Sequence, residues 1–392
     1  MERRFIFFRI FAKHINSFEM RIGFDAKRAL FNRSGLGNYS RDVISDMFSF
    51  HSENDYFLYT PKLDLSNSFY QKFPNNWVLP YNRFWRCFSS FWRYFGIADQ
   101  AKKQKINLYH GLSNEIPRGL RKNNIRSVVT IHDLIFLRFP HYYPFFSRLI
   151  YNYKSRKACK NADLIIAISE QTKADIVNFY KISPQKIEVI YQSCHEQFMY
   201  NVEKSAKKTI AEKYQLPSEF VLYVGTVEDR KNLLNLVRAM HEANLNVPLV
   251  VVGRHQRYAN VVKDYIKKHQ IDFVYFLENV DFKDFSAIYQ SASCMVNLSY
   301  FEGFGIPLVE AMYSELPMVL SNSSCFPEIA DNTALFVNPD DIKEIGTALS
   351  SVLFDEHIRK TLIENSEKRK HLFSHQQMAK ALNNCYQRLL EN

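Results

Sequence analysis

The segment Tyr300–Met312 (YFEGFGIPLVEAM) holds the residue types that most directly indicate chemistry. Pro307 predicts that a helix begins beside it, because proline is tolerated in the first turn. Glycines let a ligand approach the backbone, free amides at a helix start donate to oxyanions, and carboxylates accept from hydroxyl groups. Glu302 lies in the loop and Glu310 on the helix, so the two acids can bracket a ligand. The residues expected at this site are Glu302, Gly303, Phe304, Gly305, Ile306 and Glu310.

A second motif, Gly225–Asn232 (GTVEDRKN), follows a strand-like run and precedes a predicted helix. In α/β sheets, a loop in this position borders the ligand crevice. Arg230 and Lys231 can neutralise a diphosphate there. An Arg-Lys pair at a helix start is by itself more often a solvated edge, so the interpretation depends on the acidic and glycine-rich motif described above.

Two weaker motifs lie in the first half of the chain. Gly35 and Gly37 (SGLGN) follow the first strand-like run and open a helix, where backbone amides can meet a phosphate. A turn that needs positive φ explains the same glycines equally well. His132 and Asp133 follow another strand-like run, at the edge where cleft loops gather. A histidine beside an acid is more often structural, and Asp133 can serve to orient the histidine.

Strand-like runs alternate with helical patterns along the chain, which predicts α/β architecture with parallel sheets covered by helices. A chain of 392 residues is too long for one ordinary core, so we expect two Rossmann-like domains that face a central cleft. The strand-like runs are Arg21–Ala26, Ile106–His110, Ser127–Ile131, Leu164–Ile168, Ile187–Tyr191, Phe220–Val224, Pro248–Val252, Phe273–Leu277, Cys294–Leu298, Pro317–Leu320 and Ala334–Val337.

A polar, lysine-rich segment at Glu196–Lys213 interrupts the alternation and predicts the boundary between the two domains. The apolar stripe of the last helix, Gln376–Leu390, predicts that this helix packs back against the first domain. The expected order is an N-terminal extension at 1–19, an acceptor-side domain at 20–200, a donor-binding domain at 201–373 and the returning helix at 374–392. The extension is not expected to be a secretion signal, because it carries no small-residue cleavage site. Because Met20 directly precedes a strand-like run, the extension is either a mis-assigned start or a surface anchor.

Taken together, the motifs resemble the retaining glycosyltransferases of family 4, which have the GT-B fold. The block from Phe220 to Asp341 resembles their donor domain, and GTxExRKN combined with two glutamates that have seven residues between them is specific. Matching segments in the first half are IGFDAKR, SGLGNYSRDV, IHDL, NADLIIAISEQTKADI and KIEVIYQSCHEQF. The resemblance covers nearly all of residues 20–392.

The resemblance implies a role for each donor-site residue. Arg230 and Lys231 would hold the donor diphosphate, and Glu310 would bind the ribose hydroxyls. Glu302 would bind a hydroxyl of the transferred sugar, and the backbone of Gly303–Ile306 would complete that pocket. In this family the acceptor is thought to attack on the front face with help from the donor's own phosphate, so Glu302 is a poor candidate for a covalent nucleophile.

The resemblance also implies that Gly35 and Gly37 meet the donor phosphate across the cleft and that His132 touches the donor sugar. It implies no metal and no other cofactor, which agrees with the residues, since two cations and a helix N-terminus can offset a departing diphosphate. Asp340 and Asp341 are interpreted as helix-capping residues rather than metal ligands. The six cysteines lack metal-type spacing and suit a reducing cytosol.

Charge and aromatic residues indicate the acceptor. Residues 1–200 carry 30 Lys and Arg against 16 Asp and Glu. Two segments, 83–95 (RFWRCFSSFWRYF) and Phe139–Lys160, interleave aromatic with basic residues and predict either membrane-surface helices or core-packed ones. We expect a lipid-linked glycan acceptor and a peripheral, cytoplasmic location at the inner membrane surface. Nucleic acid is not expected as a partner, because no nucleic-acid-binding motif accompanies the charge.

The expected function is hexosyl transfer in the synthesis of a bacterial-type surface polysaccharide such as lipopolysaccharide or capsule. The segments FDAKRALFNRSGLGNYSRD and YQSC look most like the mannosyltransferase-type subgroup, which makes GDP-mannose the first candidate donor. UDP-glucose or UDP-N-acetylglucosamine would use the same contacts. A sugar-nucleotide epimerase would leave the basic, aromatic first half unexplained, and the four charged residues of the donor site argue against a non-catalytic binding subunit. The sequence gives no indication of the oligomeric state.

Overall fold

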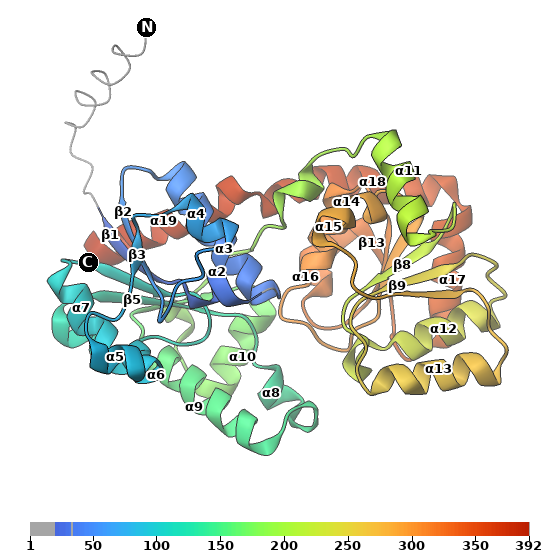
Figure 1. Cartoon of the computed structure of the whole chain (residues 1–392). Coiled ribbons are helices and arrows are strands. Elements are labelled where there is room, and N and C mark those ends of the chain that lie inside the picture. The colour runs from blue at the N-terminus through green and yellow to red at the C-terminus, as the bar shows by residue number, and fades with distance from the viewer. Residues whose placement is uncertain (1–19, 33, 392) are drawn as a thin grey trace, which may run out of the picture.

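The computed structural model describes residues 20–32 and 34–391. The chain forms two parallel β-sheets side by side, each covered by helices on both faces (Figure 1). This arrangement confirms the predicted α/β fold with two Rossmann-like units. The N-terminal extension expected at 1–19 lies outside the described residues, and the boundaries proposed at 200 and 373 stay predictions.

The first sheet has seven strands in the order β3-β2-β1-β4-β5-β6-β7, and every neighbouring pair is parallel. Its strands are β1 (Arg21–Asp25), β2 (Asp55–Tyr59), β3 (Trp77–Val78), β4 (Leu108–Gly111), β5 (Arg126–Ile131), β6 (Leu164–Ala167) and β7 (Ile187–Val189). Five of these were predicted. The strands that sequence reasoning missed are β2 and β3, which form one edge of the sheet, and β3 has only two residues.

The second sheet has six parallel strands in the order β10-β9-β8-β11-β12-β13, all of which were predicted. Its strands are β8 (Val221–Val224), β9 (Leu249–Val252), β10 (Val274–Leu277), β11 (Cys294–Asn297), β12 (Met318–Ser321) and β13 (Ala334–Val337). Several of them are buried along their whole length, as expected for strands covered on both faces.

Helices connect successive strands in both halves. In the first half they are α2 (Lys27–Phe31), α3 (Gly35–Phe50), α4 (Ser68–Lys72), α5 (Arg83–Cys87), α6 (Ser89–Phe91), the π-helical turn η1 (Trp92–Gly96), α7 (Ile97–Lys103), α8 (Ile135–Arg138), α9 (Phe145–Asn161) and α10 (Glu170–Tyr180). In the second half they are α11 (Lys204–Tyr214), α12 (Leu233–Glu242), α13 (Tyr258–Lys268), α14 (Phe285–Tyr289), α15 (Ile306–Tyr313), α16 (Phe326–Ala330), α17 (Ile342–Phe354), α18 (Glu356–Arg369) and α19 (His375–Glu391).

Each sheet has one place where the order of its strands reverses. In the first sheet it lies between β1 and β4, and in the second between β8 and β11. Helices leave the two strands at such a point on opposite faces, so a crevice opens at their carboxyl ends and ligands bind there. The fold therefore offers one such crevice in each half.

The C-terminal helix α19 returns to the first sheet, as predicted (Figure 1). Met378, Leu382 and Tyr386 are buried in the same apolar core as β1 and α3. The Tyr386 hydroxyl lies 2.6 Å from Nδ1 of His110 on β4, deep inside this core. The first half of the molecule is thus completed by residues from the end of the chain.

Within the described part of the chain, no helix is both long enough and apolar enough to cross a membrane.

We expect Leu382→Ala to lower the free energy of unfolding by about 2–5 kcal/mol, because Leu382 is fully buried and its removal leaves a cavity between α19 and the first sheet. Denaturant unfolding followed by circular dichroism measures the change. The control is Gln387→Ala, at an exposed position of the same helix, which should change stability by no more than about 0.5 kcal/mol. Equal stabilities of the two variants would contradict the docking of α19.

Candidate active site

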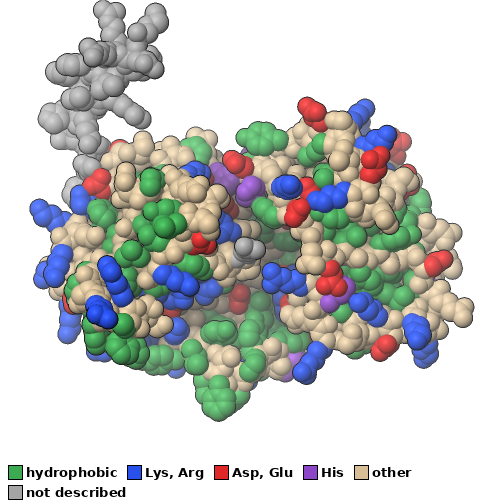
Figure 2. All heavy atoms as spheres, viewed as in Figure 1, with side chains coloured by type: hydrophobic (Ala, Val, Ile, Leu, Met, Phe, Trp, Pro, Cys, Tyr) green, Lys and Arg blue, Asp and Glu red, His purple; other side chains and the backbone are tan. Residues whose placement is uncertain are grey.

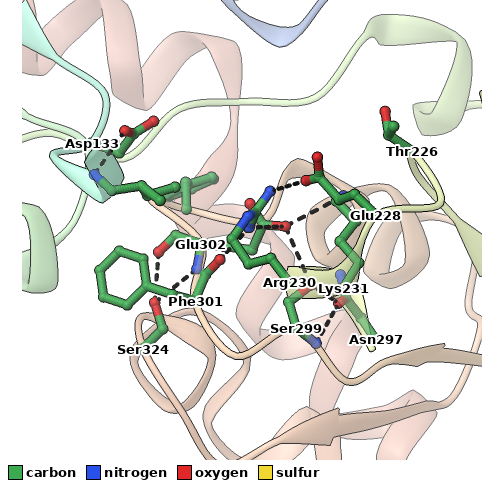
Figure 3. A network of polar contacts seen from close by, with 12 residues as sticks. Asp133, Thr226, Glu228, Arg230, Lys231, Asn297, Ser299, Phe301, Glu302 and Ser324 are labelled. Atoms are coloured by element: carbon green, nitrogen blue, oxygen red, sulfur yellow. Dashed lines mark hydrogen bonds and ion pairs between the residues drawn. The ribbon is translucent and has the colours of Figure 1, made fainter. Parts of the chain in front are cut away.

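The carboxyl ends of β8 and β11 bring the two predicted donor-site motifs together. The loop after β8 ends in the 3₁₀ turn η6 (Asp229–Lys231), and the loop after β11 carries Glu302 and leads into α15. Figure 3 shows Arg230 and Lys231 converging on the Glu302 carboxylate. The strand-order reversal of the second sheet therefore forms the site that the sequence predicted.

Glu302 is held by two cations in a buried cluster. Its Oε1 lies 3.0 Å from Arg230 Nη1 and 3.3 Å from Lys231 Nζ, and the Ser299 hydroxyl donates to the same oxygen at 3.3 Å. Burial alone would raise the pKa of Glu302, but Lys231 and Arg230 outweigh burial and lower it. Glu302 is therefore ionised at neutral pH and is able to accept from a sugar hydroxyl.

The two cations have different roles in this cluster. Arg230 also donates to Glu228 Oε1 at 2.6 Å and to the carbonyl of Phe301, so it ties the two loops to each other. Lys231 makes its ion pair with Glu302 only, among the described residues. Its side chain lies across Gly225, whose φ of +140° and missing Cβ leave the space: a Cβ there would lie 2.5 Å from Nζ. Lys231 is therefore the cation more available to a diphosphate.

The start of α15 provides unpaired backbone donors. Gly305 caps the helix with a φ of +91°, a conformation that strongly favours glycine. Within the described structure, the amides of Gly303, Phe304, Gly305 and Ile306 make no hydrogen bond. The predicted anion-binding backbone is therefore present. The Phe304 side chain is buried in the core of the second half and contributes only its backbone to the site.

Glu310 lies on α15 and is buried. The Tyr289 hydroxyl donates to its Oε2 at 2.6 Å, while Oε1 accepts no hydrogen bond from any described residue. Burial raises the pKa of Glu310 to about 7, and the Tyr289 hydrogen bond opposes this rise. The carboxyl therefore titrates in the physiological range, and one of its oxygens is free for a ligand.

His132 and Gly303 form a close backbone contact between the two halves. A Cβ on Gly303 would lie 2.2 Å from the carbonyl oxygen of His132, so only glycine fits at this position. The Ser169 hydroxyl, at the start of α10, donates to the carbonyl of Gly303 at 2.7 Å. The structure thus places His132 beside the loop that carries Glu302, as the predicted contact with the donor sugar requires.

The orientation of His132 is set by Leu112 and Tyr39. Its Nε2 donates to the Leu112 carbonyl at 2.9 Å, and the Tyr39 ring packs edge-on at 4.7 Å between centroids. Burial lowers the pKa of His132 to about 4, so the ring is neutral, with Nε2 protonated and Nδ1 an acceptor. The suggestion that Asp133 orients this histidine is wrong: its Oδ1 accepts from the Ile135 amide at 3.1 Å and so shapes the turn into α8.

The two glycines at the start of α3 have different surroundings. A Cβ on Gly35 would lie 4.0 Å from Cδ1 of Ile306, so the starts of α3 and α15 lie next to each other across the two halves. Gly37 is required sterically, because a Cβ would lie 1.9 Å from the Asn32 carbonyl oxygen. Its amide already donates to Ser34 at 2.9 Å, so of the two glycine amides only that of Gly35 remains for a phosphate.

Sequence reasoning did not predict that Phe139–Tyr143 contacts the loops of the candidate donor site. The Phe139 ring lies 5.7 Å from the ring of Phe301, and Tyr143 lies near Asp133 and Arg230. The segment Phe139–Lys160 therefore divides into a part that contacts the donor loops and a part on α9 that is largely exposed. Its aromatic composition was the available signal, but that composition did not show which residues face the cleft.

The predicted capping role near Asp340 is confirmed for Asp341, which accepts from the Glu344 amide at 3.0 Å at the start of α17. Asp340 accepts from the Tyr300 hydroxyl at 2.7 Å. Across residues 20–32 and 34–391, no cluster of three or more His, Cys, Asp or Glu side chains is arranged to hold a metal ion.

Two parallel Rossmann-like sheets, with a strand-order reversal in each, define a GT-B type of fold. A family model described as Glycosyl transferases group 1 matches residues 206–369, and one described as Glycosyltransferase Family 4 matches residues 52–194. The chain belongs to these glycosyltransferases, which confirms the resemblance found in its motifs.

Curated relatives include two bacterial proteins. The chain is 28% identical over 262 residues to O-antigen chain mannosyltransferase B of Escherichia coli, covering 65% of this chain and 67% of that protein. It is 28% identical over 227 residues to O-antigen chain mannosyltransferase RfbU of Salmonella typhimurium, covering 57% and 60%. The match to the second relative thus spans less than two thirds of its length.

Solved structures with the same fold include a glycosyltransferase from Rickettsia africae, with a TM-score of 0.73 at 17% identity over 96% of this chain and 100% of that one. Sucrose-phosphate synthase from Thermosynechococcus elongatus has a TM-score of 0.74 at 20% identity, covering 95% and 100%. At these identities the likeness confirms the predicted GT-B fold.

We expect the affinity for a nucleoside diphosphate to rise between about pH 6 and about pH 8. Because burial raises the pKa of Glu310 to about 7, its carboxyl is mostly protonated at the lower pH and ionised at the higher, and ribose hydroxyls donate to the ionised form. The gain in nucleotide affinity is limited to about tenfold per pH unit below the pKa of Glu310. Calorimetry at several pH values measures it, and Glu310→Gln should remove the dependence. If the nucleotide affinity of Glu310→Gln still changes with pH, the pH dependence arises from another group.

Proposed function

We propose that this glycosyltransferase is a retaining, metal-independent hexosyltransferase that uses a nucleoside-diphosphate sugar. The observation that carries the proposal is the buried cluster of Glu302, Arg230 and Lys231 at the start of α15. The cluster combines a carboxylate for sugar hydroxyls, cations for a diphosphate and unpaired amides for oxyanions. These are the groups that transfer from such a donor requires.

The same cluster supports transfer without a metal ion. As the bond to the sugar breaks, negative charge grows on the departing diphosphate. Lys231, Arg230 and the start of α15 can offset this charge, and their mutual contacts hold them in place before the donor arrives. No reorganisation of solvent is then needed at the moment of transfer.

Retention of configuration requires the acceptor to enter on the face from which the diphosphate leaves. In the proposed mechanism a phosphate oxygen takes the proton of the attacking hydroxyl, so no separate general base is needed. His132 is neutral and buried, which suits hydrogen bonding to a sugar hydroxyl rather than proton donation. The Glu302 carboxylate is already committed to two cations, which disfavours attack by it on the sugar.

The donor is proposed to be GDP-mannose. The two curated relatives described above are both named mannosyltransferases of O-antigen chains, and this supports mannose as the sugar and a surface glycan as the product. UDP-glucose and UDP-N-acetylglucosamine remain the alternative donors, because the ribose and diphosphate contacts are common to all three.

Calorimetric titration with GDP, UDP, GDP-mannose and UDP-glucose in the presence of a chelator tests the proposal. We expect micromolar binding of one nucleotide family without metal, and at least ~100-fold weaker binding by the Arg230→Ala/Lys231→Ala double variant, which loses two charge-assisted contacts. The matched control is Lys263→Ala/Lys267→Ala, which removes the same charge from α13. Binding that requires a divalent ion, or nucleotide affinity unchanged in the double variant, would contradict the proposed site.

The acceptor is proposed to be a lipid-linked glycan at an anionic membrane surface. The helix predicted over 83–95 is broken into α5, α6 and η1: Trp92 is buried, whereas Phe84, Phe88, Phe91 and Phe95 are exposed. On α9, Phe145 and Phe146 are 58% and 77% exposed. Figure 2 shows hydrophobic side chains gathered along this side of the first half, with Lys and Arg beside them.

Charge complementarity supports an anionic membrane as the partner of this aromatic-basic surface, which we define as the exposed faces of α5, α6, η1 and α9. The Arg148 guanidinium lies 5.3 Å from the Phe145 ring centroid, and Lys157 Nζ lies 5.1 Å from that of Tyr153. Exposed aromatic rings with cations beside them suit the boundary between lipid headgroups and acyl chains. This supports a peripheral position on the cytoplasmic face of an inner membrane.

We expect Phe145→Ala/Phe146→Ala to weaken binding to phosphatidylglycerol vesicles at least ~10-fold, because two exposed rings no longer enter the lipid. Co-sedimentation measures the affinity, and phosphatidylcholine vesicles show the contribution of charge. Phe354→Ala, at a position that is 67% exposed in the second half, is the control. Vesicle binding that is the same for all three proteins would exclude α9 from the membrane contact.

A further inference from the structure

A second crevice lies at the strand-order reversal of the first sheet. A cavity of about 340 Å³ opens beside the carboxyl ends of β1 and β4 and is bounded by α6, η1 and α9. Asp25 ends β1, and Glu115 follows β4. The cavity therefore occupies in the first sheet the position that the donor cluster occupies in the second, where α/β sheets bind ligands.

An ion-pair network joins the walls of this cavity. Arg93, on η1, lies 2.5 Å from Asp25 and 2.7 Å from Glu115, and Lys154 on α9 lies 3.1 Å from Glu115. The Nε atom of Arg93 is buried and has no partner among the described residues. A buried donor left unpaired is costly, so the network is incomplete without a further acceptor. The π-helical backbone of η1 is a form often found at functional sites.

The surroundings of the cavity carry more positive than negative charge. Lys27, Arg93 and Lys154 carry three positive charges against the two carboxylates of Asp25 and Glu115, and Lys27 makes no side-chain hydrogen bond or ion pair with any described residue. Burial and the neighbouring Arg93 lower the pKa of Lys27, although Asp25 and Glu115 oppose this shift. A connected cavity that shares Tyr94, Glu115 and Lys154 adds Arg118 and Lys157. The excess of cations fits an anion.

The mouth of the cavity is apolar and continues into the aromatic-basic surface. Phe91 and Phe95 line it and are 60% and 43% exposed, and their rings stack with centroids 6.3 Å apart. An anion that enters between these rings would carry an apolar group on its outer side. A phosphate attached to a lipid chain has this chemistry, whereas a free phosphate has no use for the rings.

We propose that this cavity binds the phosphate end of the lipid-linked acceptor, with Lys27 and Lys154 on the phosphate oxygens and Phe91 and Phe95 against the lipid. The inference rests on the proposed function, since it assigns a place to the acceptor of that reaction. Asp25 and Glu115 hold Arg93 at the base of the cavity. Lys27 has no ion pair among the described residues, and Lys154 would exchange its pair with Glu115 for the phosphate. His132 follows β5, the strand next to β4, so the cavity and the candidate donor site lie at the carboxyl ends of neighbouring strands.

Farnesyl diphosphate, titrated by calorimetry in the presence of a saturating nucleoside diphosphate that blocks the donor site, tests the proposal. We expect Lys27→Ala/Lys154→Ala to bind it at least ~10-fold more weakly than the unaltered protein. The double variant keeps Arg93 and both carboxylates, so the fold is retained. Lys102→Ala/Lys122→Ala removes the same charge from exposed positions outside the cavity and should bind within about twofold of the unaltered protein.

Two further titrations identify the source of the phosphate. Inorganic diphosphate should bind at least ~10-fold more weakly than farnesyl diphosphate, because it lacks the chain that contacts the rings. Equal affinities would overturn the lipid part of the proposal. Because Lys154 also lies on the exposed face of α9, the single variants Lys27→Ala and Lys102→Ala are compared on phosphatidylglycerol vesicles, which should bind both equally. A selective loss for Lys27→Ala would make the cavity a membrane contact instead.

The outcomes for donor and acceptor are separable. Nucleotide affinity measured on Lys27→Ala/Lys154→Ala should be unchanged. If the unaltered protein binds nucleotide and the double variant binds farnesyl diphosphate as tightly as the control, the cavity assignment fails and the proposed function stands. If farnesyl diphosphate binds through the two lysines and no nucleotide binds, the proposed function fails instead.

Discussion

The arrangement of the active site depends on the contact between Gly303 and the carbonyl of His132. A side chain at Gly303 would overlap that carbonyl. Because glycine has no side chain, the loop that carries Glu302 lies directly against the first sheet. The contact fixes the histidine relative to the carboxylate and sets the start of α15 beside the start of α3. Residues from the two sheets thereby meet at one site through direct contact.

The charged residues beside this contact form one cluster of ion pairs. Arg230 and Lys231 pair with the ionised carboxylate of Glu302, and the neighbouring His132 is neutral. The carboxylate holds the cations while the crevice is empty, and an incoming diphosphate would compete for them. Arg230 cannot move far, because it also binds Phe301 and Glu228. Lys231 has a single partner and can follow the ligand, so the crevice combines a fixed cation with an adjustable one.

Features that depend on local sequence were predictable: the buried strands, the glycine turn, the helix beginning at Ile306 and the capping by Asp341. Features that depend on distant segments were not. Asp133 binds the next turn rather than its neighbour His132, while Leu112 and Tyr39 hold the histidine from other elements. The contact between Phe139 and Phe301 joins residues more than a hundred positions apart, and no periodicity reveals such a partner. Strands β2 and β3 were also missed, and β3 has only two residues.

The return of α19 to the first sheet has a consequence for the order of folding during synthesis. Met378, Leu382 and Tyr386 belong to the core that contains β1, although nearly the entire chain separates them. The first sheet therefore emerges from the ribosome with an apolar groove exposed, and the groove stays open until α19 has been made. The second half contains its own core and can fold before that moment. The order in which the two halves become stable is thus the reverse of the order in which they are made.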